Sequence, residues 1–190
     1  MLEAMVDPSE LAPERIRPLS RREYDRMVDL GMFEDEHVEL LRGTVVTMSP
    51  QGEHHGGVVA WFSQRLTLAL GMSRQVRPAL PFAADEWSEP EPDVAVCTYD
   101  HGVHDHPTKT LLLIEVSQTS LRKDRGLKLQ IYAKAGVPEY WIVDLTTLTV
   151  EVYTQPSPTG YASVQHLRDG DLLRPTQLPG VELPVAEIPR

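Results

Sequence analysis

The pattern of hydrophobic and polar positions predicts two helices in the first part of the chain. Ser20 followed by Glu23 in SRREYDRMVDLG has the form of a capping box, and Gly31 is a typical helix end, so a helix is expected over residues 21–30. In HHGGVVAWFSQRLTLALG, apolar residues recur at helical spacing until Gly71. This second helix has an apolar face, which predicts that it packs on a sheet.

Short apolar runs predict the strands. Residues 38–50 form two short strands around an Arg42-Gly43 turn. Further strands are expected over residues 73–84, 94–99, 111–116, 139–144 and 148–154, with a helix over residues 123–135 that ends at a left-handed Gly136. Because helices bracket a run of strands, we expect one α+β or mixed α/β domain.

The length of 190 residues suits one domain with its own core. We divide the chain into an N-terminal arm over residues 1–19, a domain over 20–155, and a Pro-rich C-terminal β extension over 156–190 that packs on the same domain. Pro156 and Pro158 mark either a hairpin loop or the start of that extension.

Composition and charge narrow the class of protein. No apolar run approaches the roughly 18 residues of a membrane span, and the acidic N-terminus has no apolar signal core, so a cytoplasmic protein without a membrane partner is expected. The single cysteine, Cys97, lies in an apolar run, where a buried, inert thiol is expected rather than a nucleophile. A net charge of −10 argues against a broad basic surface for nucleic acid. It does not exclude a small cleavage site, because metal-binding carboxylates add negative charge.

One carboxylate lies inside a strand that otherwise suits a core. TLLLIEV is apolar on both faces, as a central strand is, yet it contains Glu115. An ionised glutamate is costly to bury unless it is paired or binds a metal. Asp93 follows Pro92 at the start of another apolar strand and is the expected neighbour. Two such strands side by side would set two carboxylates a few ångströms apart, which attracts a hard cation such as Mg²⁺.

A lysine on the following helix is the third candidate. Lys128 lies four residues after Asp124, one turn along the same face. An ammonium group near two carboxylates and a phosphate could orient the attacking water or stabilise the transition state. The alternative is that Asp124 and Lys128 form an ordinary surface pair, worth about 0.2–0.5 kcal/mol.

Four stretches together resemble a known family. The Pro-Asp pair at 92–93, IEVS at 114–117, the run at 122–144 and VELLRGTVVTMSP at 38–50 resemble the Uma-two family of bacterial endonucleases, in the restriction-endonuclease-like, PD-(D/E)xK superfamily. The similarity covers roughly residues 20–155. The resemblance implies a mixed central β-sheet flanked by helices in one domain, with Mg²⁺-dependent cleavage of a phosphodiester and Mn²⁺ as the other candidate ion.

The resemblance also implies roles for individual residues. By position, the metal ligands are Asp93, Glu115 and the backbone carbonyl of Val116. The superfamily usually places a lysine two residues after the glutamate; here Ser117 stands there, and Lys128 fits families in which the lysine moves to the next helix. Glu39 matches an acid that the superfamily often brings from an early element, whereas an acid beside a β-turn is otherwise often solvated.

Other polar and aromatic residues have simpler explanations. The two histidines at the start of the second helix either face a phosphate or metal site or cap the helix: His54 and His55. A polar loop, without recognised metal-ligand spacing, contains His101, His104, Asp105 and His106. Core aromatics are expected at Tyr132, Tyr140 and Trp141, and a turn at Asp144.

The expected function is Mg²⁺-dependent hydrolysis of nucleic acid, with DNA the expected substrate and a homodimer or higher homo-oligomer the expected assembly. Two alternatives stay open. The acidic balance and the absent lysine after Glu115 are also compatible with a catalytically degenerate, oligomeric binding module. A metallohydrolase acting on small phosphoesters would use the same residues.

Overall fold

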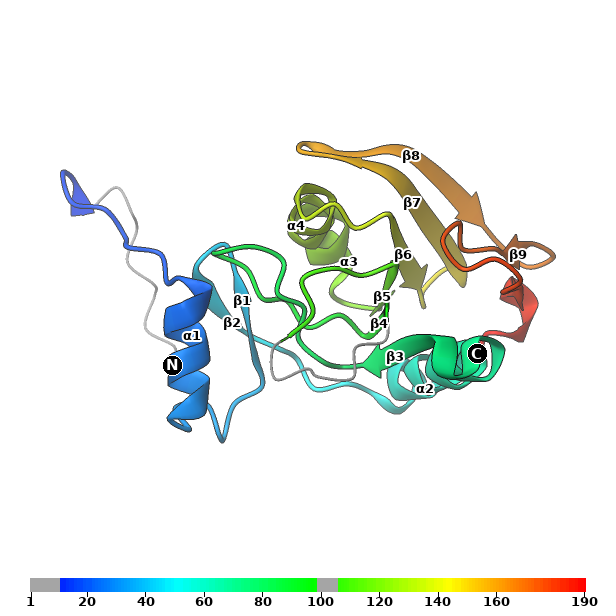
Figure 1. The fold of residues 1–190 in the computed structure, drawn as a ribbon, viewed down its shortest axis with the longest axis horizontal. Helices are drawn as coiled ribbons and strands as arrows, with labels where there is room; N and C mark the ends of the chain where they lie inside the picture. The colour runs from blue at the N-terminus through cyan, green and yellow to red at the C-terminus, as the bar shows by residue number, and fades with distance from the viewer. Residues whose placement is uncertain (1–10, 99–105) are drawn as a thin grey trace.

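The computed structural model describes residues 11–98 and 106–190. Its centre is a six-stranded mixed sheet with the strand order β3-β4-β5-β6-β7-β8 (Figure 1). The pair β5–β6 is parallel and the other neighbouring pairs are antiparallel. The strands span Arg74–Pro78 (β3), Val94–Thr98 (β4), Leu112–Ser117 (β5), Glu139–Asp144 (β6), Thr149–Ser157 (β7) and Gly160–Leu167 (β8).

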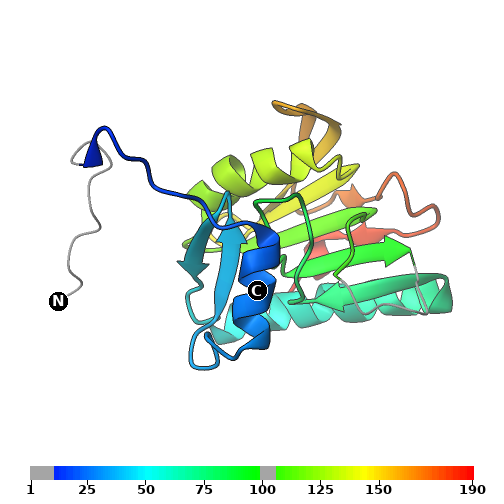
Figure 2. The same cartoon turned by 60° about the vertical axis from the view of Figure 1, so that its left-hand side comes forward.

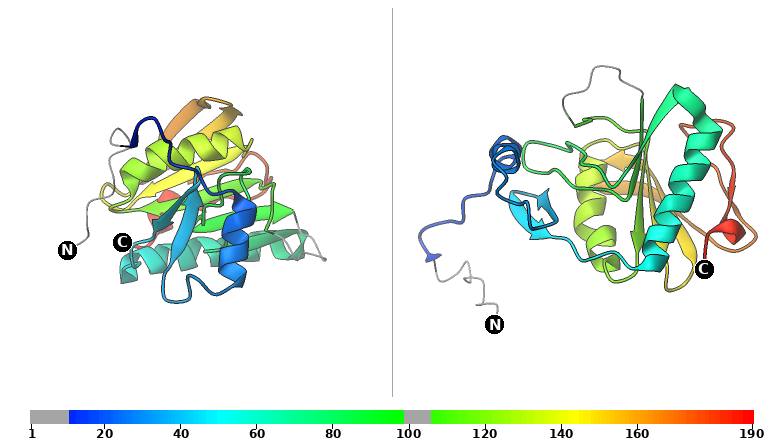
Figure 3. Two further views of the ribbon diagram at one scale, coloured as in Figure 1. Left: turned by 90° about the vertical axis from the view of Figure 1, so that its left-hand side faces the viewer. Right: turned by 90° about the horizontal axis from the view of Figure 1, so that it is seen from below.

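Helices cover both faces of this sheet (Figure 3). On one face lies α2 (Glu53–Leu70), which contributes its apolar side to the larger core cluster. On the other lies a continuous helical segment that connects β5 to β6, as a parallel pair requires. This crossover helix consists of α3 (Leu121–Lys123), the π-helical turn η3 (Asp124–Lys128) and α4 (Leu129–Lys134).

A smaller layer flanks the sheet at the N-terminal side. The helix α1 (Arg21–Asp29) lies beside the hairpin of β1 (Val38–Leu41) and β2 (Thr44–Thr47) (Figure 2). Tyr24 packs with the apolar residues of β1. Leu40 exchanges two backbone hydrogen bonds with Glu89, which fixes the segment before β4 against β1.

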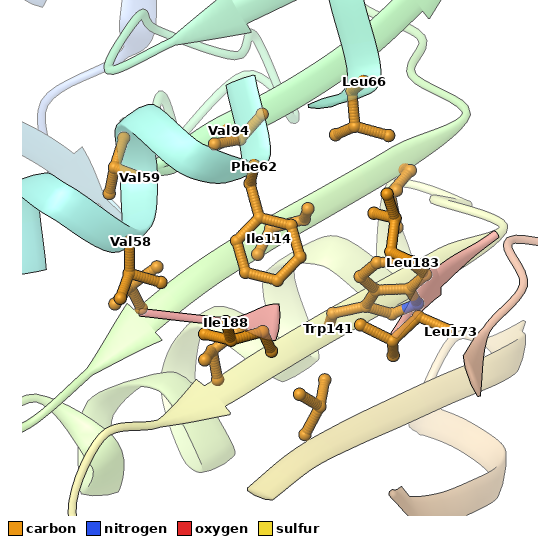
Figure 4. Close-up of a cluster of buried hydrophobic side chains, with 14 of the residues drawn as sticks. Val58, Val59, Phe62, Leu66, Val94, Ile114, Trp141, Leu173, Leu183 and Ile188 are labelled. Carbon is orange, nitrogen blue, oxygen red and sulfur yellow. The ribbon is translucent and has the colours of Figure 1, made fainter. Parts of the chain in front are cut away.

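The C-terminal part contributes apolar side chains to the same core cluster as α2. After β8 come β9 (Leu172–Leu173), β10 (Leu183–Pro184) and the 3₁₀ turn η4 (Val185–Glu187). Elsewhere in the chain, a second 3₁₀ turn, η2 (Gly71–Ser73), connects α2 to β3. Figure 4 shows side chains of this part, among them Leu183 and Ile188, gathered with those of α2 and the sheet around Trp141. Residue 155, where the sequence analysis divides the domain from the C-terminal extension, lies inside strand β7.

The predicted mixed α/β domain is confirmed. The first two helices and the hairpin also match their predicted ranges to within a few residues. The strand expected over 73–84 is shorter: it ends at Pro78, because Ala79 adopts a left-handed φ of 44° and the chain then turns toward β1. The helix expected over 123–135 begins at Leu121 and contains a π-helical turn.

Two further predictions concern the ends of elements and the membrane. Gly136 has the expected left-handed φ of 74° after α4. In the described part of the chain, no helix has the length and apolar character needed to cross a bilayer.

Candidate active site

The sheet brings two acids from distant parts of the chain together. In the antiparallel register of β4 and β5, Val94 is opposite Ile114, so Asp93 is opposite Glu115, one position further along. Side chains alternate along a strand, so both acids share the face that packs on the crossover helix. Both line a cavity of about 320 Å³.

Asp93 is held by three neighbours. Its Oδ2 accepts a 2.7 Å hydrogen bond from the backbone N–H of Val116, and Oδ1 lies 3.3 Å from Nε2 of Gln51. His55 Nε2 lies 3.2 Å from the same Oδ2. Burial opposes the charged imidazolium, but the hydrogen bond to Asp93, the charge of Asp93 and weaker contributions from Val116 and Asp124 together outweigh it and raise the pKa of His55. The carboxylate is therefore fixed at the cavity wall.

Glu115 is buried deeper in the same wall. Its Oε1 accepts a 2.6 Å hydrogen bond from the Tyr132 hydroxyl and lies 2.9 Å from Lys128 Nζ. Burial raises the pKa of Glu115 well above its usual value, against the attraction of the lysine. The carboxylate predicted to need a partner thus has two.

Lys128 is the centre of a buried charge cluster. Its side chain is 2% exposed, and Nζ lies 2.9 Å from Glu115 and 3.0 Å from Oε2 of Glu39. Burial disfavours the ammonium, but the two carboxylates outweigh this and raise the pKa of Lys128. The surface-pair alternative is therefore wrong: Asp124 and Lys128 are both buried, and the ion-pair partners of Lys128 lie on β1 and β5.

Glu39 is buried behind two lysines of the cavity wall, Lys123 and Lys128, and is not a solvated turn residue. Its Oε1 lies 2.7 Å from Lys123 Nζ, and its Oε2 accepts a hydrogen bond from the backbone N–H of Glu91 at 3.2 Å. Burial alone would raise its pKa, but Lys128 and Lys123 lower it below the usual value. The site therefore has a second ammonium group, from Lys123, which the sequence analysis missed.

The π-helical turn supplies a further acid. Asp124 is buried, and its Oδ2 accepts 2.6 Å hydrogen bonds from the hydroxyls of Ser117 and Ser120. The other oxygen, Oδ1, is buried without a hydrogen-bond partner, and Asp124 lines the cavity. Ser117 thus helps to position an acid. π-turns often occur at functional sites.

The remaining candidates lie elsewhere or serve the core. His54 Nε2 lies 3.1 Å from the carbonyl of Pro189 and is not among the cavity-lining residues. Burial confirms Cys97 as a core thiol and raises its pKa to about 11. The predicted core aromatics are buried, and Asp144 accepts a turn hydrogen bond from Thr146. The predicted polar loop at His101, His104 and Asp105 lies outside the described residues; His106 lines a different cavity.

The donor set suits a hard divalent ion that keeps several waters. Mg²⁺ is usually held by one or two carboxylates and completed by water and substrate oxygens. Asp93 and Glu115, with the unpartnered oxygen of Asp124 nearby in the same cavity wall, offer such donors. Within residues 11–98 and 106–190, no group of three or more His, Cys, Asp or Glu side chains is arranged to hold an ion alone. Substrate and water oxygens would have to complete the shell.

The fold and the cavity define a mixed α/β protein with an acid–lysine cluster where β4 and β5 meet the crossover helix. The model of the Uma2 family, described as "Putative restriction endonuclease", matches residues 21–186. The chain therefore belongs to the Uma2 family.

A solved structure has the same fold. It is the crystal structure of a "putative nuclease belonging to DUF820" from Anabaena variabilis ATCC 29413, with a TM-score of 0.70 and 17% sequence identity. The similarity covers 90% of this chain and 97% of that one. No curated protein matches the sequence.

Proposed function

We propose that this protein is a metal-dependent endonuclease that hydrolyses phosphodiester bonds of nucleic acid, with DNA as its substrate. The observation that carries the proposal is the buried cluster of Lys128 with Glu115 and Glu39. Two members of the cluster, Lys128 and Glu115, line one cavity together with Asp93. Buried charges at this density destabilise a fold unless they are fully paired, and they are typical of functional sites.

Each residue has a chemical role in this proposal. Asp93 and Glu115, with the Val116 carbonyl, would hold Mg²⁺ or Mn²⁺. A bound divalent ion would lower the pKa of a water and stabilise charge on the phosphoryl oxygens. Lys128 stays protonated beside its two carboxylates and can orient the attacking water. Glu39 orients Lys128, and Lys123, which reaches the cavity wall, can contact a substrate phosphate.

The acidic surface restricts how substrate binds. With a net charge of −10, binding depends on few phosphate contacts, so the affinity for nucleic acid should fall only modestly as the salt concentration rises. A homodimer would let two such cavities face the two strands of a duplex, and we include this assembly in the proposal. Light scattering of the purified chain tests it: a monomer mass would contradict it.

The direct test is nicking of supercoiled plasmid DNA with Mg²⁺ or Mn²⁺, run beside RNA and a nitrophenyl phosphate. We expect DNA cleavage that chelator stops and that the double variant Asp93→Asn, Glu115→Gln lacks. The matched control is Asp169→Asn, Glu187→Gln, two exposed acids in surface ion pairs, which should cleave as the wild type does.

Cleavage retained by the site variant would overturn the assignment. Hydrolysis of the nitrophenyl ester alone would favour a small-phosphoester hydrolase. No cleavage together with no Mn²⁺ binding in calorimetry would favour a non-enzymatic binding module.

A further inference from the structure

A second cavity lies on the other side of β1 from the candidate active site. Its volume is about 420 Å³, larger than that of the active-site cavity. It lies between α1, β1 and the segment that precedes β4, and we call it the α1 cavity. Its lining residues are Arg21, Tyr24, Asp25, Val28, Asp29, Phe33, Glu36, His37, Val38, Pro81, Glu89, Glu91 and His106.

The charge of the α1 cavity is strongly negative. Five of its lining residues are acids, and among them stands one arginine, Arg21. Two histidines contact acids: His37 Nε2 lies 2.8 Å from Glu91, and His106 Nε2 lies 3.7 Å from Oε1 of Glu89. When both histidines are neutral, the single positive charge of Arg21 does not balance the negative charges of the five carboxylates. The cavity therefore attracts cations.

Glu89 is the acid of this cavity that has a buried oxygen without a hydrogen-bond donor. It is 3% exposed, and its Oε2 is buried without a hydrogen-bond partner. The same oxygen forms a long ion pair with Nη1 of Arg21, which lies 3.7 Å away, beyond hydrogen-bond distance. Burial, followed by repulsion from Asp25, raises the pKa of Glu89 to about 7. Two backbone hydrogen bonds with Leu40 hold the backbone of Glu89 in place beside the cavity.

An aromatic wall faces the same space. Tyr24 and Phe33 pack with ring centroids 5.7 Å apart and line the cavity together with the apolar Val28. Aromatic faces attract organic cations, which also carry apolar surface that such walls bury. A bare metal ion would gain nothing from the rings, and the described residues contain no compact set of three metal-ligand side chains.

We propose that the α1 cavity binds an organic cation, a guanidinium or primary ammonium group, with Glu89 as the carboxylate that receives it. The group comes either from a free small amine or from an arginine or lysine side chain of a peptide. Oε2 of Glu89 gains the donor that it lacks, and the rings of Tyr24 and Phe33 contact the apolar part of the ligand.

This site is separate from the proposed nuclease site but shares a backbone segment with it. Glu89 and Glu91 point their side chains to the α1 cavity, whereas the backbone of Glu91 contacts Glu39 and Lys128 and the next acid, Asp93, lines the active-site cavity. The proposal does not depend on nuclease activity, because binding is measured directly.

The test is a titration of the full-length protein with agmatine and, separately, with an acetylated, amidated Gly-Arg-Gly peptide, followed by calorimetry and amide NMR shifts. We expect saturable binding of at least one probe, with shifts at Tyr24 and Glu89. The probe that binds more tightly shows whether the cation comes from a free small amine or from a side chain of a peptide. Glu89→Gln keeps the shape and removes a buried charge, so it should fold and lose affinity at least tenfold.

The matched control is Glu182→Gln, an exposed acid paired with Arg174 far along the chain, which should bind as the wild type does. Circular dichroism and thermal unfolding show whether each variant is folded. Absence of saturable binding by both probes, or equal affinity in the folded Glu89→Gln variant, would overturn the proposal. Displacement of agmatine by equimolar Mg²⁺ would replace the organic ligand with a metal.

Discussion

Replacing Lys128 by methionine tests the buried charge cluster most sharply. The change keeps much of the side-chain volume and removes the ammonium group that lies 2.9 Å from Glu115 and 3.0 Å from Glu39. Glu39 keeps Lys123 at 2.7 Å, so Glu115 is the carboxylate that loses its ionic partner. Breaking a buried pair in this way typically destabilises a protein by about 3–5 kcal/mol. We expect about 3 kcal/mol at pH 8, because Glu39 remains paired and the Tyr132 hydroxyl still donates to Glu115.

The effect should depend on pH in a known direction. A buried acid with a raised pKa stabilises the fold below its unfolded pKa, near 4.5, and that contribution is lost as pH rises toward the folded value. Lys128 attracts Glu115 and limits the rise of its pKa. Without Lys128 the pKa of Glu115 rises further, so in the variant the loss of stability with rising pH, at up to about 1.4 kcal/mol per pH unit, continues to higher pH than in the wild type.

Urea unfolding followed by tryptophan fluorescence at pH 5 and pH 8 measures both effects. Lys134→Met is the matched control, since Lys134 is an exposed residue of the same helix paired with Asp85 and should cost less than about 1 kcal/mol. Adding Glu115→Gln to Lys128→Met should recover much of the loss. A loss under 1 kcal/mol at pH 8, or a loss independent of pH, would refute the reasoning.

Three further predictions follow from buried groups. Glu89→Gln should stabilise the protein at pH 8 by up to about 3 kcal/mol and have little effect at pH 4. The reason is that the pKa of Glu89 is raised to about 7, so the stability of the wild type falls as the pH rises from about 4.5 to 7. Urea unfolding at both pH values checks this, and the same difference in unfolding free energy between variant and wild type at pH 4 and pH 8 would contradict it. Tyr132→Phe should cost about 1–2 kcal/mol in the same assay, because Glu115 loses its 2.6 Å hydrogen bond, whereas Tyr153→Phe, at a half-buried position on β7, should cost less. Cys97 should react with a thiol reagent at the rate of global unfolding, because it is buried and its pKa is raised to about 11; fast labelling of the native protein would show that the thiol is accessible.

The sequence predicts the parts of the molecule that are set by local signals. The capping box at Ser20 and Glu23 forms as expected, and both acceptor and donor bonds of the box are present. The apolar surroundings of Glu115 predict burial and a partner, because an ionised group in such a strand is costly without one. The sequence predicts Asp93 as the neighbour of Glu115, and the resemblance gives Lys128 a role at the site. That Lys128 and Tyr132 are the direct partners of Glu115 follows only from the structure.

Other features depend on contacts between distant segments. Glu39 is buried because the segment before β4 returns along β1, and no local pattern at Glu39 predicts that return. No local pattern places Lys123 at the site, because its partner, Glu39, lies 84 positions earlier in the chain. The π-helical turn arises in a segment with ordinary helical spacing, where the Tyr140 hydroxyl bonds the Asp124 carbonyl and the Leu129 N–H reaches that same carbonyl.

The α1 cavity is a clear case of the same limit. Its acids come from α1, from the loop before β1 and from the segment before β4, so no short motif contains them. An acid such as Glu89 in EPEPD looks like a solvated loop residue in the sequence. Its burial and missing partner follow only from the pairing of this segment with Leu40.

The central claim is that Asp93 and Glu115 hold a divalent ion beside Lys128. A crystal of the wild-type protein soaked in Mn²⁺ tests it most directly, by anomalous scattering at the manganese edge. The account predicts a single strong peak within coordination distance of both carboxylates, and its loss in crystals of Asp93→Asn. A map with no peak in that cavity, or with manganese bound among the acids of the α1 cavity instead, would contradict it.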